Sequence, residues 1–126
     1  MNLFSSTVLG LGKALDLYAA RHRVLAENVA HAETPGYRAK EMEFGGELER
    51  AFEKQTRREA RSSLSADASE SLDAGLPPRI ELRRDPVDLD REMALLSENS
   101  LRVTALSRIV ARKYAGLKSL IGGLGR

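Results

Sequence analysis

The first 32 residues carry a regular spacing of apolar side chains. The side chains recur at intervals that alternate between four and three residues, and one histidine interrupts the apolar series. The positions are Phe4, Val8, Leu11, Leu15, Tyr18, His22, Leu25, Val29 and Ala32. A repeat of about 3.5 residues places them on one stripe of an α-helix, and such a stripe packs against another helix as in a coiled coil. Thr34-Pro35-Gly36 predicts the end of this helix, because proline disfavours helical backbone in the residue before it.

The C-terminal segment repeats the pattern. Its positions are Leu89, Met93, Leu96, Ser100, Val103, Ser107, Val110, Tyr114, Leu117 and Ile121. Asp88 is the expected N-cap of this helix, and Gly122, Gly123 and Gly125 are expected to end it. We therefore predict a mainly α fold in which long N- and C-terminal helices pair as an α-helical coiled coil.

The middle of the chain differs from both ends. Glu43–Glu59 is expected to hold a short helix with Phe44 and Phe52 on one side. Residues 62–78 are rich in Ser, Ala and Asp and predict a mobile loop, so we expect a partly disordered middle segment. Residues 79–82 alternate polar and apolar side chains and predict a short strand. The expected organisation is an N-terminal helix and turn (1–37), a variable middle segment (38–87) and a C-terminal helix (88–126), the first and last forming one helical domain.

The composition fits one small domain that neighbouring chains complete. The chain has 126 residues, no cysteine, 5% aromatic residues and a formal net charge of +2. Lack of cysteine excludes a disulfide scaffold, a thiolate zinc site and a cysteine nucleophile. No apolar run approaches the ~18 residues that span a bilayer, so we expect no membrane insertion, and no cleaved signal peptide is expected either. Two paired helices leave part of each surface uncovered, and we expect other subunits to cover it.

Candidate catalytic and ligand-binding residues are few. His22 lies in the apolar stripe, where a hydrogen-bonded interface role is expected, and His31 lies at a helix end, where it would interact with the helix dipole. Their separation of nine residues does not fit a helical metal site. No phosphate-binding glycine loop is present, and the basic residues of the C-terminal helix share it with the apolar stripe. We predict no enzyme activity, cofactor, metal, small-molecule substrate or nucleic-acid partner.

One motif, within residues 26–38, goes beyond these patterns. Its members are Asn28, Ala30, Thr34, Pro35, Gly36 and Tyr37. They match the approximate signature Asn-Ile-Ala-Asn-x-x-Thr-Pro-Gly-Tyr-Lys of the flagellar axial proteins, the rod and hook family, with His31 in place of the second Asn. Residues 87–102 resemble the start of the C-terminal helix in a short rod protein of this family. Residues 84–86 depart from the pattern, because relatives commonly have Gly-Asn ahead of Val-Asp.

The resemblance implies a structural subunit of the proximal rod of the bacterial flagellar basal body. Such subunits assemble helically in the periplasm, forming the drive shaft and the export channel, after export through the flagellar type III apparatus. Phe4 and Val8 fit the Phe-x-x-x-hydrophobic element that the export gate recognises, as do Phe44 and Leu48. The implied partners are other copies of the chain, FlgC-like and FlgF-like rod subunits, a FliE-like base adaptor and the export gate.

Two alternatives remain at this point. The first is FlgC or another small axial protein, although FlgC usually carries extra residues in the Thr-Pro-Gly-Tyr loop and this chain has none. The second is a soluble helical adaptor or export chaperone that would use the same apolar stripes.

We name two predicted sets of assembly contacts. The N-terminal seam comprises Val8, Leu11, Leu15, Tyr18, Leu25 and Val29. The C-terminal seam comprises Leu89, Met93, Leu96, Val103, Val110, Tyr114, Leu117 and Ile121. The motif turn and the middle segment are also expected to contact neighbouring subunits.

Overall fold

A computed structural model describes residues 3–62 and 77–124 and shows a mainly helical chain. The elements in order are α1 (Leu3–Ala30), β1 (Lys40–Met42), α2 (Phe44–Ser62), β2 (Ile80–Leu82) and α3 (Leu89–Leu124). The predicted fold class is confirmed: α1 and α3 are long helices in contact, and the middle holds a helix and two short strands. Most of the loop predicted at 62–78 lies outside the described residues.

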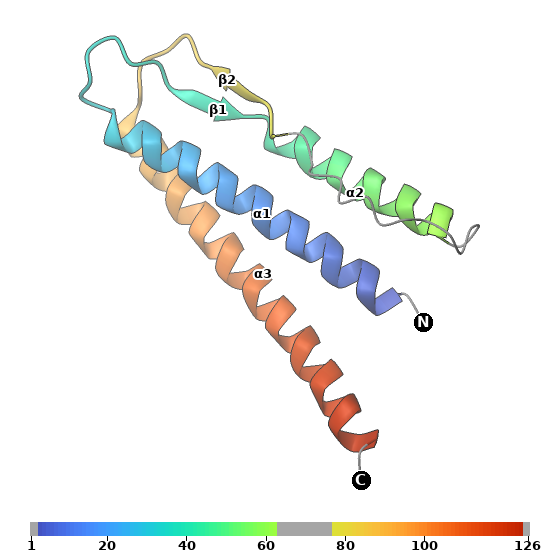
Figure 1. Ribbon diagram of the computed structural model, residues 1–126. Coiled ribbons are helices and arrows are strands. Elements are labelled where there is room, and N and C mark those ends of the chain that lie inside the picture. The colour runs from blue at the N-terminus through green and yellow to red at the C-terminus, as the bar shows by residue number, and fades with distance from the viewer. Residues whose placement is uncertain (1–2, 63–76, 125–126) are drawn as a thin grey trace.

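α1 is the central element of the fold. It contacts α3, α2 and β1. Figure 1 shows α1 and α3 crossing near the turn and separating toward the two chain termini, while α2 runs beside α1. After the turn the chain runs back through β1 and α2, returns along β2 and reverses again into α3, so that α3 runs antiparallel to α1 and the N- and C-termini lie at the same end of the helix pair (Figure 1).

The hydrophobic core is small and follows α1. The buried apolar side chains are Ala14, Tyr18, Val24, Leu25, Ala39 and Met42. The ring of Tyr18 lies 4.4 Å from that of Phe44 between centroids, and this contact joins α1 to the start of α2. The guanidinium of Arg21 lies 5.2 Å from the Phe44 ring centroid, a cation–π contact that shields the ring from solvent.

The two strands form a short antiparallel ribbon beside α1. Lys40 lies opposite Leu82, Glu41 opposite Glu81 and Met42 opposite Ile80. The strand predicted at residues 79–82 is therefore present as β2, while β1 was not predicted. Two strands alone are marginally stable in water, so the ribbon depends on its contact with α1.

The helix boundaries test the predicted start and stop signals. Asp88 caps α3 as predicted, because its Oδ1 accepts the backbone N–H of Arg91 at 3.2 Å. The prediction that Gly122 and Gly123 end α3 is wrong, since the helix continues through Leu124, and Gly125 lies outside the described residues. A glycine ends a helix by adopting a left-handed conformation, and among the described glycines only Gly36 has positive φ.

Candidate functional site

A buried polar cluster joins the end of α1 to the ribbon and to the start of α3. Its centre is Asn28, which is fully buried. The Asn28 amide group donates to the backbone oxygen of Lys40 at 2.8 Å, and its Oδ1 accepts the backbone N–H of Lys40 at 2.9 Å. The side chain thus binds both polar groups of one strand residue, as a third strand would. We call this cluster, with Tyr37, Arg83 and Glu92, the polar junction.

Glu92 brings α3 into the polar junction. Its side chain is 1% exposed, and its two oxygens have different donors. Oε2 accepts from the amide of Asn28 at 3.0 Å, and Oε1 accepts from Nη1 of Arg83 at 3.3 Å. Arg83 also approaches Glu41 at 3.5 Å through Nε. A buried carboxylate is tolerated only when it is paired and hydrogen-bonded, so Glu92 ties three segments together.

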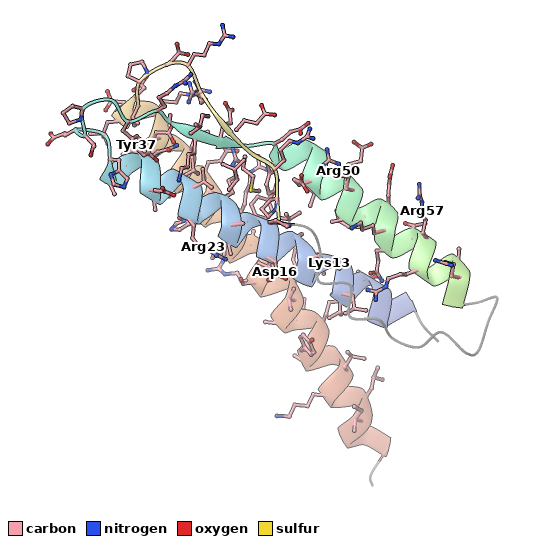
Figure 2. The ribbon with its side chains drawn as sticks, turned by 45° about the horizontal axis from the view of Figure 1, so that its top comes forward. Lys13, Asp16, Arg23, Tyr37, Arg50 and Arg57 are labelled. Atoms are coloured by element: carbon pink, nitrogen blue, oxygen red, sulfur yellow. The ribbon has the colours of Figure 1, made fainter. Side chains whose placement is uncertain are left out.

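The motif turn closes over this junction. Tyr37 donates its hydroxyl hydrogen to Oδ1 of Asn28 at 3.2 Å, and its ring stacks on His31 with centroids 4.7 Å apart. Gly36 reaches the required backbone geometry with φ of 77°, a region that residues with a Cβ rarely adopt. Figure 2 shows Tyr37 at the turn, at the opposite end of the molecule from Arg57 on α2.

The charges around the turn shift two pKa values upward. Burial raises the pKa of the Tyr37 hydroxyl, and the nearby carboxylate of Glu27 raises it further. The hydrogen bond that Lys40 Nζ donates to Glu27 raises the pKa of Lys40. Both shifts favour the protonated side chains in the folded chain, so the free energy of unfolding is expected to fall as the pH rises through the pKa values of these two groups.

The structure separates the residues of the predicted motif. Asn28 and Tyr37 enter the polar junction, whereas Ala30, Thr34, Pro35 and Gly36 are exposed. His31, expected to interact with the helix dipole, directly follows the end of α1; its ring stacks on Tyr37 and its Nδ1 lies 3.3 Å from the Thr34 hydroxyl. His22 is exposed on α1.

The N-terminal seam lies largely against the rest of the chain. Tyr18 and Leu25 are buried, and the other members, Val8, Leu11, Leu15 and Val29, are half-buried. Helix α1 therefore packs against other elements of its own chain, and its half-buried seam residues still leave some apolar surface uncovered.

The C-terminal seam divides into two groups. Half-buried members are Leu96, Val103, Val110 and Leu117, and exposed members are Leu89, Met93, Tyr114 and Ile121. The line of α3 that is most buried passes through Glu92 and Asn99, one residue away from Met93 and Ser100. The exposed fraction reaches 57% at Tyr114 and 72% at Ile121, so apolar surface is concentrated toward the C-terminal end of α3.

Asn99 is a further buried polar residue that the sequence pattern did not reveal. Its amide group donates to the backbone oxygen of Tyr18 at 3.0 Å and so links the middle of α3 to the middle of α1. Its Oδ1 has no hydrogen-bond partner among the residues that the structure describes. One turn further on, Arg102 binds Glu98 through two nitrogens, at 3.0 and 2.7 Å, on the surface of the same helix.

The described residues offer little that would suit catalysis or membrane insertion. Within residues 3–62 and 77–124, no three His, Asp or Glu side chains are grouped so that they could hold a metal ion. None of the helices in those ranges is long and apolar enough to cross a membrane. The features that remain are the polar junction and the exposed apolar side chains.

The chain is similar to flagellar rod proteins along most of its length. It is 36% identical over 121 residues to the flagellar basal body rod protein FlgB of Cereibacter sphaeroides strain ATCC 17029, covering 88% of this chain and 90% of the relative. It is 31% identical to FlgB of Yersinia ruckeri, covering 86% and 88% of the two chains. It is 28% identical to FlgB of Bacillus subtilis, covering 98% of each. No protein-family model matches the chain.

Proposed function

Because this chain belongs to the FlgB family of flagellar basal body rod proteins, we propose that its two seams are the surfaces through which it assembles into the rod. The chain is a structural rod protein and not an enzyme. The observation that carries the proposal is the exposure of large apolar side chains along one 36-residue helix, from Leu89 to Ile121. Exposed apolar surface on this scale marks a protein–protein contact.

In the proposed assembly, α1 and α3 form a helical domain and neighbouring subunits cover the exposed seam residues. Each covered side chain contributes through loss of apolar area from water, at about 25 cal/mol per Å². Repetition of the same contact in a helical array gives a stiff shaft from many small terms. The polar junction holds the other end of each subunit in one arrangement, so that the free ends of α1 and α3 are presented in a fixed direction.

Membership of the FlgB family also suggests which proteins the two seams contact. We propose copies of the chain itself, FlgC-like and FlgF-like rod subunits and a FliE-like adaptor at the base as neighbours in a periplasmic rod with a central channel. Before assembly, the flagellar type III export gate would recognise Phe4 and Val8. Val8 is half-buried on α1, and the side chain of Phe4 lies outside the described part of the chain.

Two charge insertions test the seams. Ile121→Asp and Val110→Asp each place a charge where a neighbour would bury it, and we expect loss of the chain from purified basal bodies and loss of motility. Ser119→Asp, exposed on the same helix, is the matched control and should assemble normally.

Folding of the purified variants separates assembly from stability. Ile121 is 72% exposed, so Ile121→Asp should leave the free energy of unfolding of the isolated chain within ~0.5 kcal/mol of the unmodified protein. Normal motility with Ile121→Asp and Val110→Asp would show that the C-terminal seam is not an assembly surface. The basal-body fraction of the unmodified chain tests the alternative of a cytoplasmic adaptor or chaperone, which would be absent from it.

A further inference from the structure

Helices α2 and α3 both pack on α1 but are kept apart by it. Within the described ranges 44–62 and 89–124, α2 and α3 do not contact each other. Figure 1 shows them on different sides of α1. A change at α2 can therefore reach α3 by two routes, through the body of α1 or through the β1–β2 ribbon that adjoins α2 in the chain.

Tyr18 of α1 has contacts with both of these helices. Its ring lies 4.4 Å from the ring of Phe44 at the start of α2, measured between centroids. Its backbone oxygen accepts a hydrogen bond from the Asn99 amide of α3 at 3.0 Å. Tyr18 is 8% exposed, so these contacts within the chain account for most of its surface although it belongs to the N-terminal seam.

The hydroxyl of Tyr18 adds a second link to α3. Hydrogen bonding to Glu98, and then to Tyr18, raises the pKa of the Arg102 guanidinium. Arg102 follows Asn99 by less than one helical turn. Helix α3 thus holds Tyr18 by its backbone oxygen and by its side chain, while α2 covers its ring. A displacement of Tyr18 changes its contacts with α2 and α3 together.

The burial of Asn99 indicates that its bond to Tyr18 has a positioning role. Asn99 is fully buried, and its Oδ1 has no partner among the described residues. A buried acceptor without a partner costs free energy, so gain of stability does not explain an asparagine at this place. In helix pairs a buried asparagine fixes the register of one helix on the other at a cost in stability. The amide of Asn99 fixes α3 on α1 at the residue whose ring packs on α2.

Phe52 is a second aromatic residue of α2 that contacts α1 elsewhere. A Cβ added at Gly10 would lie 3.5 Å from Cε1 of Phe52, so this ring packs beside Gly10. Gly10 lies about two turns before Tyr18 on α1. Phe44 and Phe52 therefore form a matched pair, because both are rings that α2 places on α1 and they differ in the part of α1 that they contact.

We propose that Tyr18 is a positioning residue that couples the packing of α2 on α1 to the packing of α3 on α1. The Phe44 ring holds Tyr18 where the Asn99 amide reaches its backbone oxygen, so loss of the Phe44 contact weakens the hold of α1 on α3. The converse also follows, since an energetic coupling is reciprocal. If the seams assemble as proposed above, α2 thereby helps to set the direction in which α3 presents the C-terminal seam.

A double-mutant cycle on the full chain tests the coupling. Phe44→Ala, Asn99→Ala and the double variant are unfolded in urea, and their unfolding equilibrium constants are compared with that of the unmodified chain. The two effects should depart from additivity by roughly threefold or more, as for residues that share a partner. The matched control is the cycle of Phe52→Ala with Asn99→Ala, which should be additive within about twofold.

Variants of Tyr18 identify the route of the coupling. In a Tyr18→Leu background, which removes the ring, the cycle of Phe44→Ala with Asn99→Ala should become additive within about twofold. In a Tyr18→Phe background, which keeps the ring, the departure from additivity should remain. Coupling that runs through the β1–β2 ribbon would instead persist in Tyr18→Leu.

Amide hydrogen exchange tests the same coupling without combined variants, some of which are too destabilised to fold if the losses add. In Phe44→Leu, the amides of residues 99–103 should exchange roughly threefold faster relative to those of residues 26–30 at the polar junction. Phe52→Leu should leave this ratio unchanged. A role of Phe44 confined to α2 would leave it unchanged as well, because α2 and α3 do not contact each other in the described ranges.

Four outcomes would overturn the proposal. They are additivity of Phe44→Ala with Asn99→Ala, an equal departure from additivity with Phe52→Ala, coupling that persists in Tyr18→Leu, and an unchanged exchange ratio in Phe44→Leu. All of these measurements use the isolated chain and need no rod. Their failure therefore leaves the proposed seam assembly unaffected, and normal motility of Ile121→Asp would leave the coupling unaffected.

Discussion

The two ends of the α1–α3 pair are built on opposite principles. At the turn end, the side chains of Asn28, Tyr37 and Glu92 form a network in which each makes at least one side-chain hydrogen bond. At the terminal end, the helices separate, and Tyr114 and Ile121 are mostly exposed apolar side chains (Figure 1). Hydrogen bonds within the chain fix the geometry of the turn end. The terminal end instead presents apolar side chains, whose contacts do not depend on direction. The difference shows where the chain is complete and where it needs a neighbour.

The largest expected effect comes from removing the centre of the junction. Asn28→Ala leaves the backbone groups of Lys40 and one oxygen of Glu92 without their partners in a buried site, and should lower the free energy of unfolding by about 3 kcal/mol. The measurement is urea unfolding of the isolated chain followed by circular dichroism.

Asn99 provides the matched control for that measurement. It is also fully buried at the α1–α3 contact, but within the described part of the chain its side chain makes one hydrogen bond, through the amide group, and its Oδ1 has no partner. Asn99→Leu should change the free energy of unfolding by less than ~1 kcal/mol, because the unpaired oxygen is removed with the bond. If Asn28→Ala and Asn99→Leu lower the free energy of unfolding by the same amount, the hydrogen bonds of the polar junction do not stabilise the fold more than the single bond of Asn99.

A smaller effect is expected from the turn itself. Gly36→Val places a branched side chain at φ of 77°, a conformation that costs residues with a Cβ roughly 1–2 kcal/mol. The same urea titration measures the loss. Gly45→Ala is the control, since beyond the adjacent helix backbone no described atom lies within 4 Å of the added Cβ and the position is helical. That control should be neutral or stabilising by up to ~1 kcal/mol, and an equal loss at the two glycines would contradict the backbone argument.

The contrast between the two ends also marks what the sequence could predict. Spacing located both long helices, and Asp88 as a cap was confirmed, because these signals are local. β1 was missed, because Lys40-Glu41-Met42 becomes a strand only through a partner about forty positions away and the amide of Asn28.

The buried line of α3 was likewise beyond pattern reasoning. Glu92 and Asn99 occupy it, and a spacing rule assigns buried positions to apolar residues. The partners of Glu92 are Arg83, which precedes α3, and Asn28, which lies 64 positions earlier on α1, and no spacing rule connects these residues. Only the motif pointed to Asn28, and that signal came from family resemblance rather than from periodicity.

The smallest expected effect is on the pH dependence of the free energy of unfolding, which should differ between a change at the turn and a change at the terminal end. The pKa of Tyr37 is raised from its usual 10.0 and that of Lys40 from its usual 10.5. Above each usual value the unfolded chain loses a proton that the folded chain keeps, so the free energy of unfolding falls as pH rises through this window. Below about pH 9 neither group contributes to the slope.

Tyr37→Phe should remove part of that alkaline fall and cost less than ~1 kcal/mol at pH 7, where it loses one hydrogen bond to Asn28. Tyr114→Phe is the control at the other end, because Tyr114 is 57% exposed. Urea titrations at several pH values between 7 and 11 compare the two variants. A fall with the same slope in Tyr37→Phe as in the unmodified chain would mean that Tyr37 does not contribute to the alkaline loss of stability. A change in the slope of the free energy of unfolding against pH in Tyr114→Phe would contradict its use as a control at the terminal end.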